Sequence, residues 1–155
     1  MKVPNNHLLV IRQLDAKLKD FSALAQFNPP PRGWISQLRK AFNMSLAQIG
    51  DRLSKTPQAV KEIEKREGDE SITLKSLREA GDALNMKLVY GFVPKDESLE
   101  KMVEDRAREL ALKIVKRTST TMKLEDQENS SLRLKQAVDE LTQEIKREMP
   151  RSLWD

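Results

Sequence analysis

The sequence contains no cysteine and only one histidine, His7, among its 155 residues. Without cysteine there is neither a disulfide framework nor a thiolate zinc site, which fits a reducing cytosol. One histidine without cysteine leaves most nucleophile–base pairs incomplete, and the chain has no GxGxxG, phosphate loop or HExxH. We therefore predict a protein that is not an enzyme, has no catalytic residues and binds no cofactor or metal.

Long hydrophobic runs are also absent. The first twenty residues, MKVPNNHLLVIRQLDAKLKD, combine a short apolar run with several charges, which suits neither a signal peptide nor a membrane span. We expect a cytoplasmic protein with no membrane partner. A chain of this length can bury a core of its own without metals or disulfides.

Charge, by contrast, is abundant and unevenly placed. The chain has 28 basic and 24 acidic residues, a net charge of +4. Residues 32–66 hold eight basic residues against three acidic ones, so the rest of the chain has a net charge of −1. A basic region between near-neutral flanks suits a polyanion partner. An ordinary solvated helical surface has the same composition, so charge alone does not choose between the two.

Residues 45–64, SLAQIGDRLSKTPQAVKEIE, have the pattern of two short helices joined by a tight turn. We expect the first helix from about Ser45 to Leu53 and the second from about Pro57 to Arg66. Each helix has its apolar residues on one face. These residues are Leu46, Ile49 and Leu53 in the first helix, and Val60 and Ile63 in the second.

The starts of both helices are marked in the sequence. Ser45 and Thr56 occupy N-cap positions, and Pro57 stands at the first helical position, where its missing N–H costs nothing. Only two residues separate the first helix from the second cap, so the helices must cross steeply. This geometry predicts a helix-turn-helix, whose second helix enters the major groove of double-stranded DNA.

The flanking sequence suggests three parts. An amphipathic helix pattern covers residues 6–26, and Pro29–Pro31 then force a stiff extended spacer, with a polyproline recognition ligand as the alternative. We place an N-terminal helical arm at 1–28, a DNA-binding domain at 32–94 and a C-terminal helical extension at 97–155. Further helices are expected at 32–42, with Trp34 and Phe42 pointing inward, and at 72–84, 97–117 and 130–147.

Residues 86–93, MKLVYGFV, change to a strand pattern that ends at Pro94. A lone strand leaves its backbone groups unpaired, so we expect the same segment of a second copy to pair with it and form a homodimer. The alternative is an extended segment held on the helical core. The expected fold is thus mainly α, a helix-turn-helix bundle with one short dimerising strand and helical extensions at both ends.

The region from about Arg32 to Leu88 resembles the phage-repressor-like helix-turn-helix family, through LRKAFNMSLAQIGDRLSKTPQAVKEIE and ITLKSLREAGDAL. The resemblance implies a five-helix layout. It also implies that Arg39 of the first helix pairs with Glu64 of the recognition helix. The sequence departs from the family at Ser54, where a glycine is usual, and at Gly50, where an alanine is usual.

A second resemblance rests on segments spread along the chain: PPRGWI at 30–35, SITLKSLREAGDAL at 71–84, LVYGFVP at 88–94, LEDQ at 124–127 and the final RSLWD. Through these segments the whole chain resembles the mobile mystery protein A family. Members resemble regulators encoded beside a Fic-domain protein, which implies a toxin–antitoxin-like pair. Fic inhibitors have the pattern Ser/Thr-x-x-x-Glu-Gly/Asn, which nominates Glu128, although Leu124 stands where Ser or Thr belongs. A polar linker is the alternative for this segment.

We predict that Gln58, Lys61 and Glu62 face the bases, because they share one face of the helix that begins at Pro57. Capping residues and flanking lysines should contact phosphates. The predicted phosphate contacts are Ser45, Lys55, Thr56 and Lys65.

The C-terminal extension should bind the partner protein, with Leu153 and Trp154 exposed at the chain end. Trp154 either anchors in a partner pocket or packs on its own domain. The function predicted is a sequence-specific repressor of its own operon and an antitoxin of a Fic-domain protein. The rival prediction is a helical antitoxin that binds its partner without reading DNA.

Overall fold

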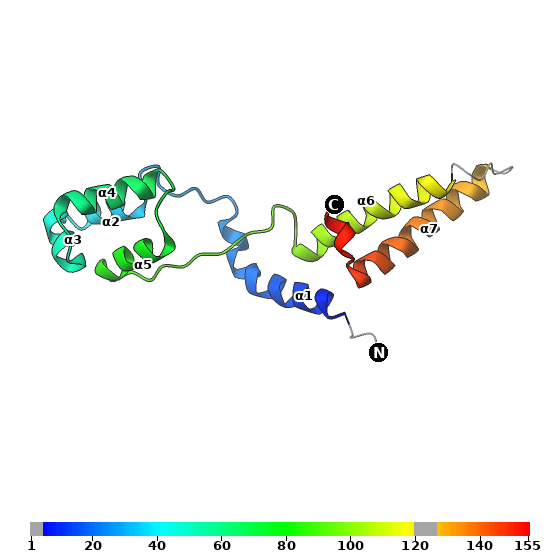
Figure 1. The fold of residues 1–155 in the computed structure, drawn as a ribbon, viewed down its shortest axis with the longest axis horizontal. Helices are drawn as coiled ribbons and strands as arrows, with labels where there is room; N and C mark the ends of the chain where they lie inside the picture. Colours follow the sequence, from blue (N-terminus) through cyan, green and yellow to red (C-terminus); the bar gives the residue numbers. More distant parts are fainter. Residues whose placement is uncertain (1–4, 120–126) are drawn as a thin grey trace. The chain divides into compact units, whose positions relative to one another are not determined.

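The computed structural model describes residues 5–119 and 127–155, and these form a mainly α-helical fold. The chain divides into two compact units (Figure 1). We call residues 26–91 the central unit, and residues 1–25 with 92–155 the terminal unit. None of the described helices is long and apolar enough to cross a membrane.

The central unit is a bundle of four helices: α2 (Trp34–Ala41), α3 (Leu46–Leu53), α4 (Pro57–Gly68) and α5 (Leu74–Ala83) (Figure 1). Its core forms where the apolar faces of these helices meet, as their spacing predicts. The buried residues are Ile35, Ile49, Val60, Ala80 and Leu84. Leu46, Leu53 and Ile63 pack against them, so the predicted inward faces of α3 and α4 do line this core.

The terminal unit combines helices from both ends of the sequence. It contains α1 (His7–Leu18), the short 3-10 helix η1 (Lys19–Leu24), α6 (Leu99–Ser119), α7 (Gln127–Glu148) and the 3-10 helix η2 (Arg151–Trp154). The helices α6 and α7 lie side by side (Figure 1). The buried core residues are Val103, Ala107, Ala111, Val138, Ile145 and Leu153. Sequence analysis treated the N-terminal helix as a separate arm, whereas it packs with the C-terminal helices in one unit.

Residues 86–93 form no strand in the described chain, which departs from the strand prediction. A strand requires a hydrogen-bonded neighbour, and the part of the chain that the structure describes supplies none. The segment is not held on the core along its whole length either, since Val89, Tyr90 and Phe92 are exposed and Phe92 reaches 83%. Pairing with a second copy stays a prediction.

Two aromatic residues predicted to point inward are half exposed, so this part of the prediction is wrong. Trp34 is the first residue of α2, and Phe42 follows its last residue, so neither stands on the buried face of the helix. Trp34 instead stacks on Phe27, with ring centroids 5.6 Å apart and ring planes almost parallel. The stack covers one face of each ring, although both side chains remain partly in solvent.

Candidate nucleic-acid interface

The first helix of the predicted motif, α3, begins with a complete capping box. The Gln48 backbone N–H donates to Ser45 Oγ at 3.1 Å, and the Ser45 N–H donates to Gln48 Oε1 at 2.8 Å. At the start of α4, the Ala59 N–H donates to Thr56 Oγ1 at 3.1 Å, and Pro57 takes the first helical position. Each capping hydroxyl acts as an acceptor here, so its own proton is left to donate to an external anion.

The turn between α3 and α4 contains Ser54 and packs against Gly50, the two positions at which the sequence differs from the family that it resembles. Ser54 has φ 55° and ψ 43°, a left-handed conformation that glycine adopts more easily. The Lys55 N–H donates to the Gly50 carbonyl at 2.8 Å and closes the turn. A Cβ added at Gly50 would lie only 2.5 Å from the Lys55 carbonyl oxygen. The turn therefore approaches α3 too closely for an alanine at position 50.

The helix α4 presents two different faces. Val60 is fully buried and Ile63 is half-buried, so this side fixes the helix to the core. Every position predicted to contact DNA is exposed, both on α4 and just before α3 and α4. These positions are Pro57, Gln58, Lys61, Glu62 and Lys65 on α4, with Ser45, Lys55 and Thr56 just before the two helices. An exposed polar face on a rigidly packed helix is what base readout requires.

Arg39 of α2 and Glu64 of α4 form the ion pair that the resemblance implied. Arg39 Nε donates to Glu64 Oε1 at 2.5 Å and Arg39 Nη2 donates to Glu64 Oε2 at 3.1 Å. The two side chains are only 14% and 11% exposed. Arg39 Nη1 also donates to the Met44 carbonyl at 3.0 Å. The hydrogen bond to Glu64 raises the pKa of the Arg39 guanidinium above its ordinary value, so the pair stays charged and joins the two helices.

Sequence analysis missed a second connection between the same helices. The Glu67 carboxylate of α4 accepts the backbone N–H groups of Trp34 at 2.7 Å and Ile35 at 2.8 Å, so it caps the start of α2. The residue before α2 is Gly33, at φ 83°, and a Cβ there would lie 2.5 Å from the Glu67 side chain. One signal was available: Gly33 has no side chain to cap α2, and Glu67 lies three residues after Glu64 on α4.

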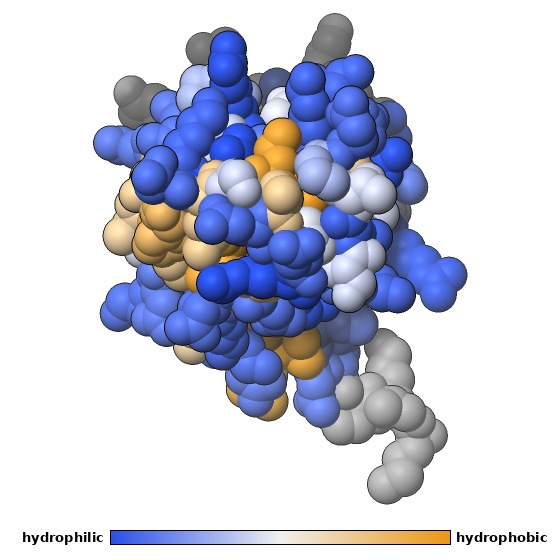
Figure 2. Space-filling model, turned by 90° about the vertical axis from the view of Figure 1, so that its left-hand side faces the viewer, coloured by the Kyte–Doolittle hydropathy of each residue, from blue (hydrophilic) through white to orange (hydrophobic). Residues whose placement is uncertain are grey.

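The cations on and beside α4 are largely unpaired. Lys55, Lys61 and Lys65 form no ion pair within the described residues. Glu62 lies 3.6 Å from Arg66, but both side chains are half exposed and this contact is weak. Figure 2, turned so that the left-hand side of Figure 1 faces the viewer, shows hydrophilic residues over most of this face and apolar residues gathered in one part of it. The arrangement leaves positive charge available to an external anion.

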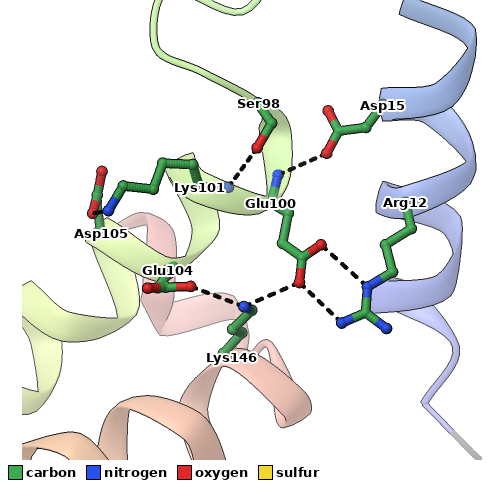
Figure 3. A network of polar contacts seen from close by, with 8 residues as sticks. All are labelled: Arg12, Asp15, Ser98, Glu100, Lys101, Glu104, Asp105 and Lys146. Carbon is green, nitrogen blue, oxygen red and sulfur yellow. Dashed lines mark hydrogen bonds and ion pairs between the residues drawn. The ribbon is translucent and has the colours of Figure 1, made fainter. Parts of the chain in front are cut away.

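Four charged residues of the terminal unit, in contrast, form a network with one another (Figure 3). Arg12 of α1 donates to both oxygens of Glu100 at 3.0 and 3.1 Å, and Lys146 Nζ of α7 lies 3.0 Å from Glu100 Oε1 and 2.9 Å from Glu104. The hydrogen bond from Arg12 and then that from Lys146 lower the pKa of Glu100 to about 2. Burial opposes the charge of Lys146, but its hydrogen bonds to Glu104 and Glu100 prevail and raise the pKa of its ammonium group.

The residues predicted to bind a protein partner have different environments. Leu153 is 2% exposed in the core of the terminal unit, so the prediction that it lies open to a partner is wrong. The reason is that η2 folds the chain end back, and Arg106 Nη2 donates to the Leu153 carbonyl at 3.2 Å. Trp154 is 50% exposed. The backbone of Glu128 belongs to the first turn of α7, while its side chain lies outside the described residues.

Within the described ranges, no group of three or more histidine, cysteine, aspartate or glutamate side chains could hold a metal ion. No protein-family model, no curated protein and no solved structure matches the chain.

Proposed function

We propose that this chain is a sequence-specific DNA-binding regulator that represses its own operon. The observation that carries the proposal is α4, whose buried face holds Val60 and whose opposite face exposes Gln58, Lys61, Glu62 and Lys65. Gln58 can bind adenine with two hydrogen bonds, and Lys61 can donate to guanine. Glu62 can only accept, so it favours cytosine or rejects other bases.

The way α4 is held supports this role. The Arg39–Glu64 pair joins α4 to α2 midway along the helix, and Glu67 joins it again one turn later. Two links at different points along the axis restrict both tilt and rotation of α4. Base readout requires such restriction, because bidentate hydrogen bonds tolerate little misplacement.

The test is a binding scan of the full chain on the DNA upstream of its own gene, at two salt concentrations. A sequence-specific regulator binds one segment far more tightly than random duplex, and its affinity falls steeply as salt rises. Equal affinity for all segments would contradict sequence-specific regulation. Affinity independent of salt would exclude the phosphate contacts assigned to Ser45, Lys55, Thr56 and Lys65.

We propose further that the regulator acts as a homodimer through residues 87–93. Val89, Tyr90 and Phe92 are exposed in the single chain, and an extended segment with free backbone groups can pair with a second copy. Two copies also supply two recognition helices for a palindromic site. Val89→Pro removes a backbone donor and should shift sedimentation towards the monomer. If the variant still sediments as a dimer, the interface lies elsewhere, and residues 6–26 are the next candidate.

The second part of the proposed function is antitoxin activity toward a Fic-domain protein encoded beside this gene. It derives from the family resemblance, and Trp154, with half of its surface open, is the available anchor in the terminal unit. Deleting residues 97–155 is an unsuitable test, because α1 packs against this segment. Trp154→Ala should instead weaken co-purification of the partner, with Arg151→Ala as the neighbouring control. Equal recovery with both variants would exclude Trp154 as an anchor.

Glu128→Gly tests the narrower inhibitory role of this acid. If the partner stays fully inhibited by this variant, inhibition works by burying or sequestering the partner and not through an inserted glutamate.

The alternative function is an interaction module that binds the partner without reading DNA. Exposed apolar residues on α1, namely Leu9, Val10 and Leu14, favour an interaction role for the terminal unit. Partner binding without any sequence preference for DNA would establish this alternative.

A further inference from the structure

A groove of about 340 Å³ runs between α2 and α4 of the central unit. Arg32 and Lys40 line it from α2 and the residues just before that helix, while Lys61 and Lys65 line it from α4. Sequence analysis assigned roles to the two lysines of α4 and none to Arg32 or Lys40. The groove therefore extends the basic surface beyond the recognition helix itself.

The charge of this groove is strongly positive. Its two carboxylates are Glu64, which is neutralised by Arg39, and Asp69. Arg32, Lys40, Lys61 and Lys65 form no ion pair or side-chain hydrogen bond within the described residues. Four cations facing a single unpaired acid repel one another unless an anion lies among them.

The position of the groove indicates which anion it binds. Lys61 and Lys65 belong both to the groove and to the exposed face of α4, so the groove opens directly beside the surface that reads bases. When a helix enters a major groove, the phosphates of the bordering strand lie along its side. Arg32 and Lys40 therefore stand where they can reach the backbone that Lys65 is assigned to contact from α4.

We propose that the groove between α2 and α4 binds the sugar–phosphate backbone of one DNA strand, with Arg32 and Lys40 as phosphate contacts. This inference rests on the proposed DNA-binding function and adds Arg32 and Lys40, on the α2 side of the groove, to the DNA interface. Free phosphate or polyphosphate offers the same chemistry as a DNA phosphate. The experiment must therefore separate these two sources.

The first arm measures binding of the full chain to a short random-sequence duplex across a salt series, since phosphate contacts need no operator. Arg32→Ala and Lys40→Ala should each reduce the slope of log affinity against log salt by about one, and the double variant by about two. Arg78→Ala is the matched control, because Arg78 is an exposed residue of α5 in the same unit that does not line the groove. The control should keep the wild-type slope.

The outcomes separate this inference from the function on which it rests. If the wild-type chain binds duplex and both groove variants keep its slope, the groove does not hold the backbone, while DNA binding stands. If the wild-type chain binds no duplex at any salt, the proposed function itself fails. Unchanged Trp34 fluorescence of each variant in a Trp154→Phe background would show that the central unit remains folded.

The second arm titrates the full chain with tripolyphosphate and with inorganic phosphate. A backbone site needs several phosphates at fixed spacing on a duplex, so we expect only weak binding of both small anions. Tight tripolyphosphate binding that Arg32→Ala and Lys40→Ala abolish would overturn the assignment. The groove would then be a site for a free polyphosphate.

Discussion

The two compact units differ in the charged residues that they bring together. In the terminal unit, Arg12, Glu100, Lys146 and Glu104 form a continuous network in which each charge has an opposite neighbour (Figure 3). In the central unit, the described ion pairs are the nearly buried Arg39–Glu64 and the exposed Glu62–Arg66. The remaining cations around α4 are unpaired. Pairing within the terminal unit contributes to its own stability, whereas the unpaired cations around α4 can interact with an external anion.

The units nevertheless share one structural device. In the central unit, Glu67 accepts two N–H groups at the start of α2. In the terminal unit, Asp15 of α1 accepts the N–H groups of Leu99 and Glu100 at the start of α6, at 2.8 and 3.0 Å. A carboxylate on one helix thus caps another helix in both cases. Each cap satisfies backbone donors, and its negative charge interacts favourably with the positive end of the helix dipole.

The strongest test of the comparison removes the buried pair of the central unit. Glu64→Gln leaves Arg39 without its counter-charge and should lower the free energy of unfolding by about 3–5 kcal/mol. Glu62→Gln is the control, since its pair with Arg66 is half exposed and should contribute less than about 1 kcal/mol. Urea unfolding in a Trp154→Phe background follows the central unit alone, because Trp34 is then the remaining tryptophan. Equal stability of the two variants would show that Arg39 is well solvated.

A second test concerns the terminal unit. Leu153→Ala should lower its free energy of unfolding by about 2–5 kcal/mol, because the lost side chain leaves a cavity in a packed core. Trp154→Ala should cost less than about 1 kcal/mol if Trp154 serves a partner. Circular dichroism melts compare the two variants. A large loss from Trp154→Ala as well would mean that this residue holds the chain end on its own domain.

The unpaired polar face of α4 leads to a prediction about binding instead of stability. Gln58→Ala should lose about 1–3 kcal/mol of affinity on the preferred upstream site and far less on random duplex. The measurement is a pair of fluorescence-anisotropy titrations at one salt concentration. Equal losses of affinity on the two duplexes would show that Gln58 contacts the DNA backbone and does not read bases.

Acid should weaken the terminal unit through Glu100. The folded-state pKa of Glu100, about 2, lies below its ordinary value of 4.5, so the unfolded chain takes up this proton first. The stabilisation is therefore complete above about pH 4.5 and is lost as pH falls towards 2. Because the Arg12 side chain is exposed and water screens its charge, this stabilisation should amount to about 1 kcal/mol. Trp154 fluorescence in a Trp34→Phe background measures the stability of the terminal unit as a function of pH. In Glu100→Gln this stability should depend less on pH between 4.5 and 2. An unaltered acid profile in that variant would contradict the role of Glu100.

The smallest expected effect lies in the turn between α3 and α4. Ser54→Gly relieves a left-handed conformation and should raise stability by about 0.5–1 kcal/mol. Gly50→Ala should have the opposite sign, because its methyl group would collide with the Lys55 carbonyl. Thermal melts of the two variants give the signs directly. A stabilising Gly50→Ala would show that the turn relaxes away from α3.

The features that sequence analysis predicted well are local ones. Hydrophobic spacing and capping residues marked the starts of α3 and α4, since Ser45 and Thr56 satisfy donors only three residues away. The predicted bounds of these helices agree with the structure within two residues. The Arg39–Glu64 pair came from a family resemblance, because nothing local connects residues so far apart in sequence. The exposure of Gln58, Lys61 and Glu62 followed from helical periodicity.

Errors arose where the environment of a residue depends on where a helix ends or on which distant segment lies beside it. Spacing alone suggested that Trp34 and Phe42 point inward, but α2 begins at Trp34 and ends just before Phe42, which leaves both residues at its margins. The residues 86–93 have strand composition, yet a ladder depends on a second segment that composition cannot supply. Leu153 looked exposed because chain ends commonly fray, but η2 returns it to the core.

The sequence by itself determined the mainly helical fold, the positions of α3 and α4 and which residues of α4 face solvent, because these depend on spacing within a few turns. Only the tertiary structure decided that α1 packs with α6 and α7, that Glu67 and Asp15 cap helices far away in sequence, and that Leu153 is buried. The same holds for the groove that brings Arg32 and Lys40 beside Lys61 and Lys65. Such contacts join residues tens of positions apart, and packing of complete helices fixes them, which no local pattern encodes.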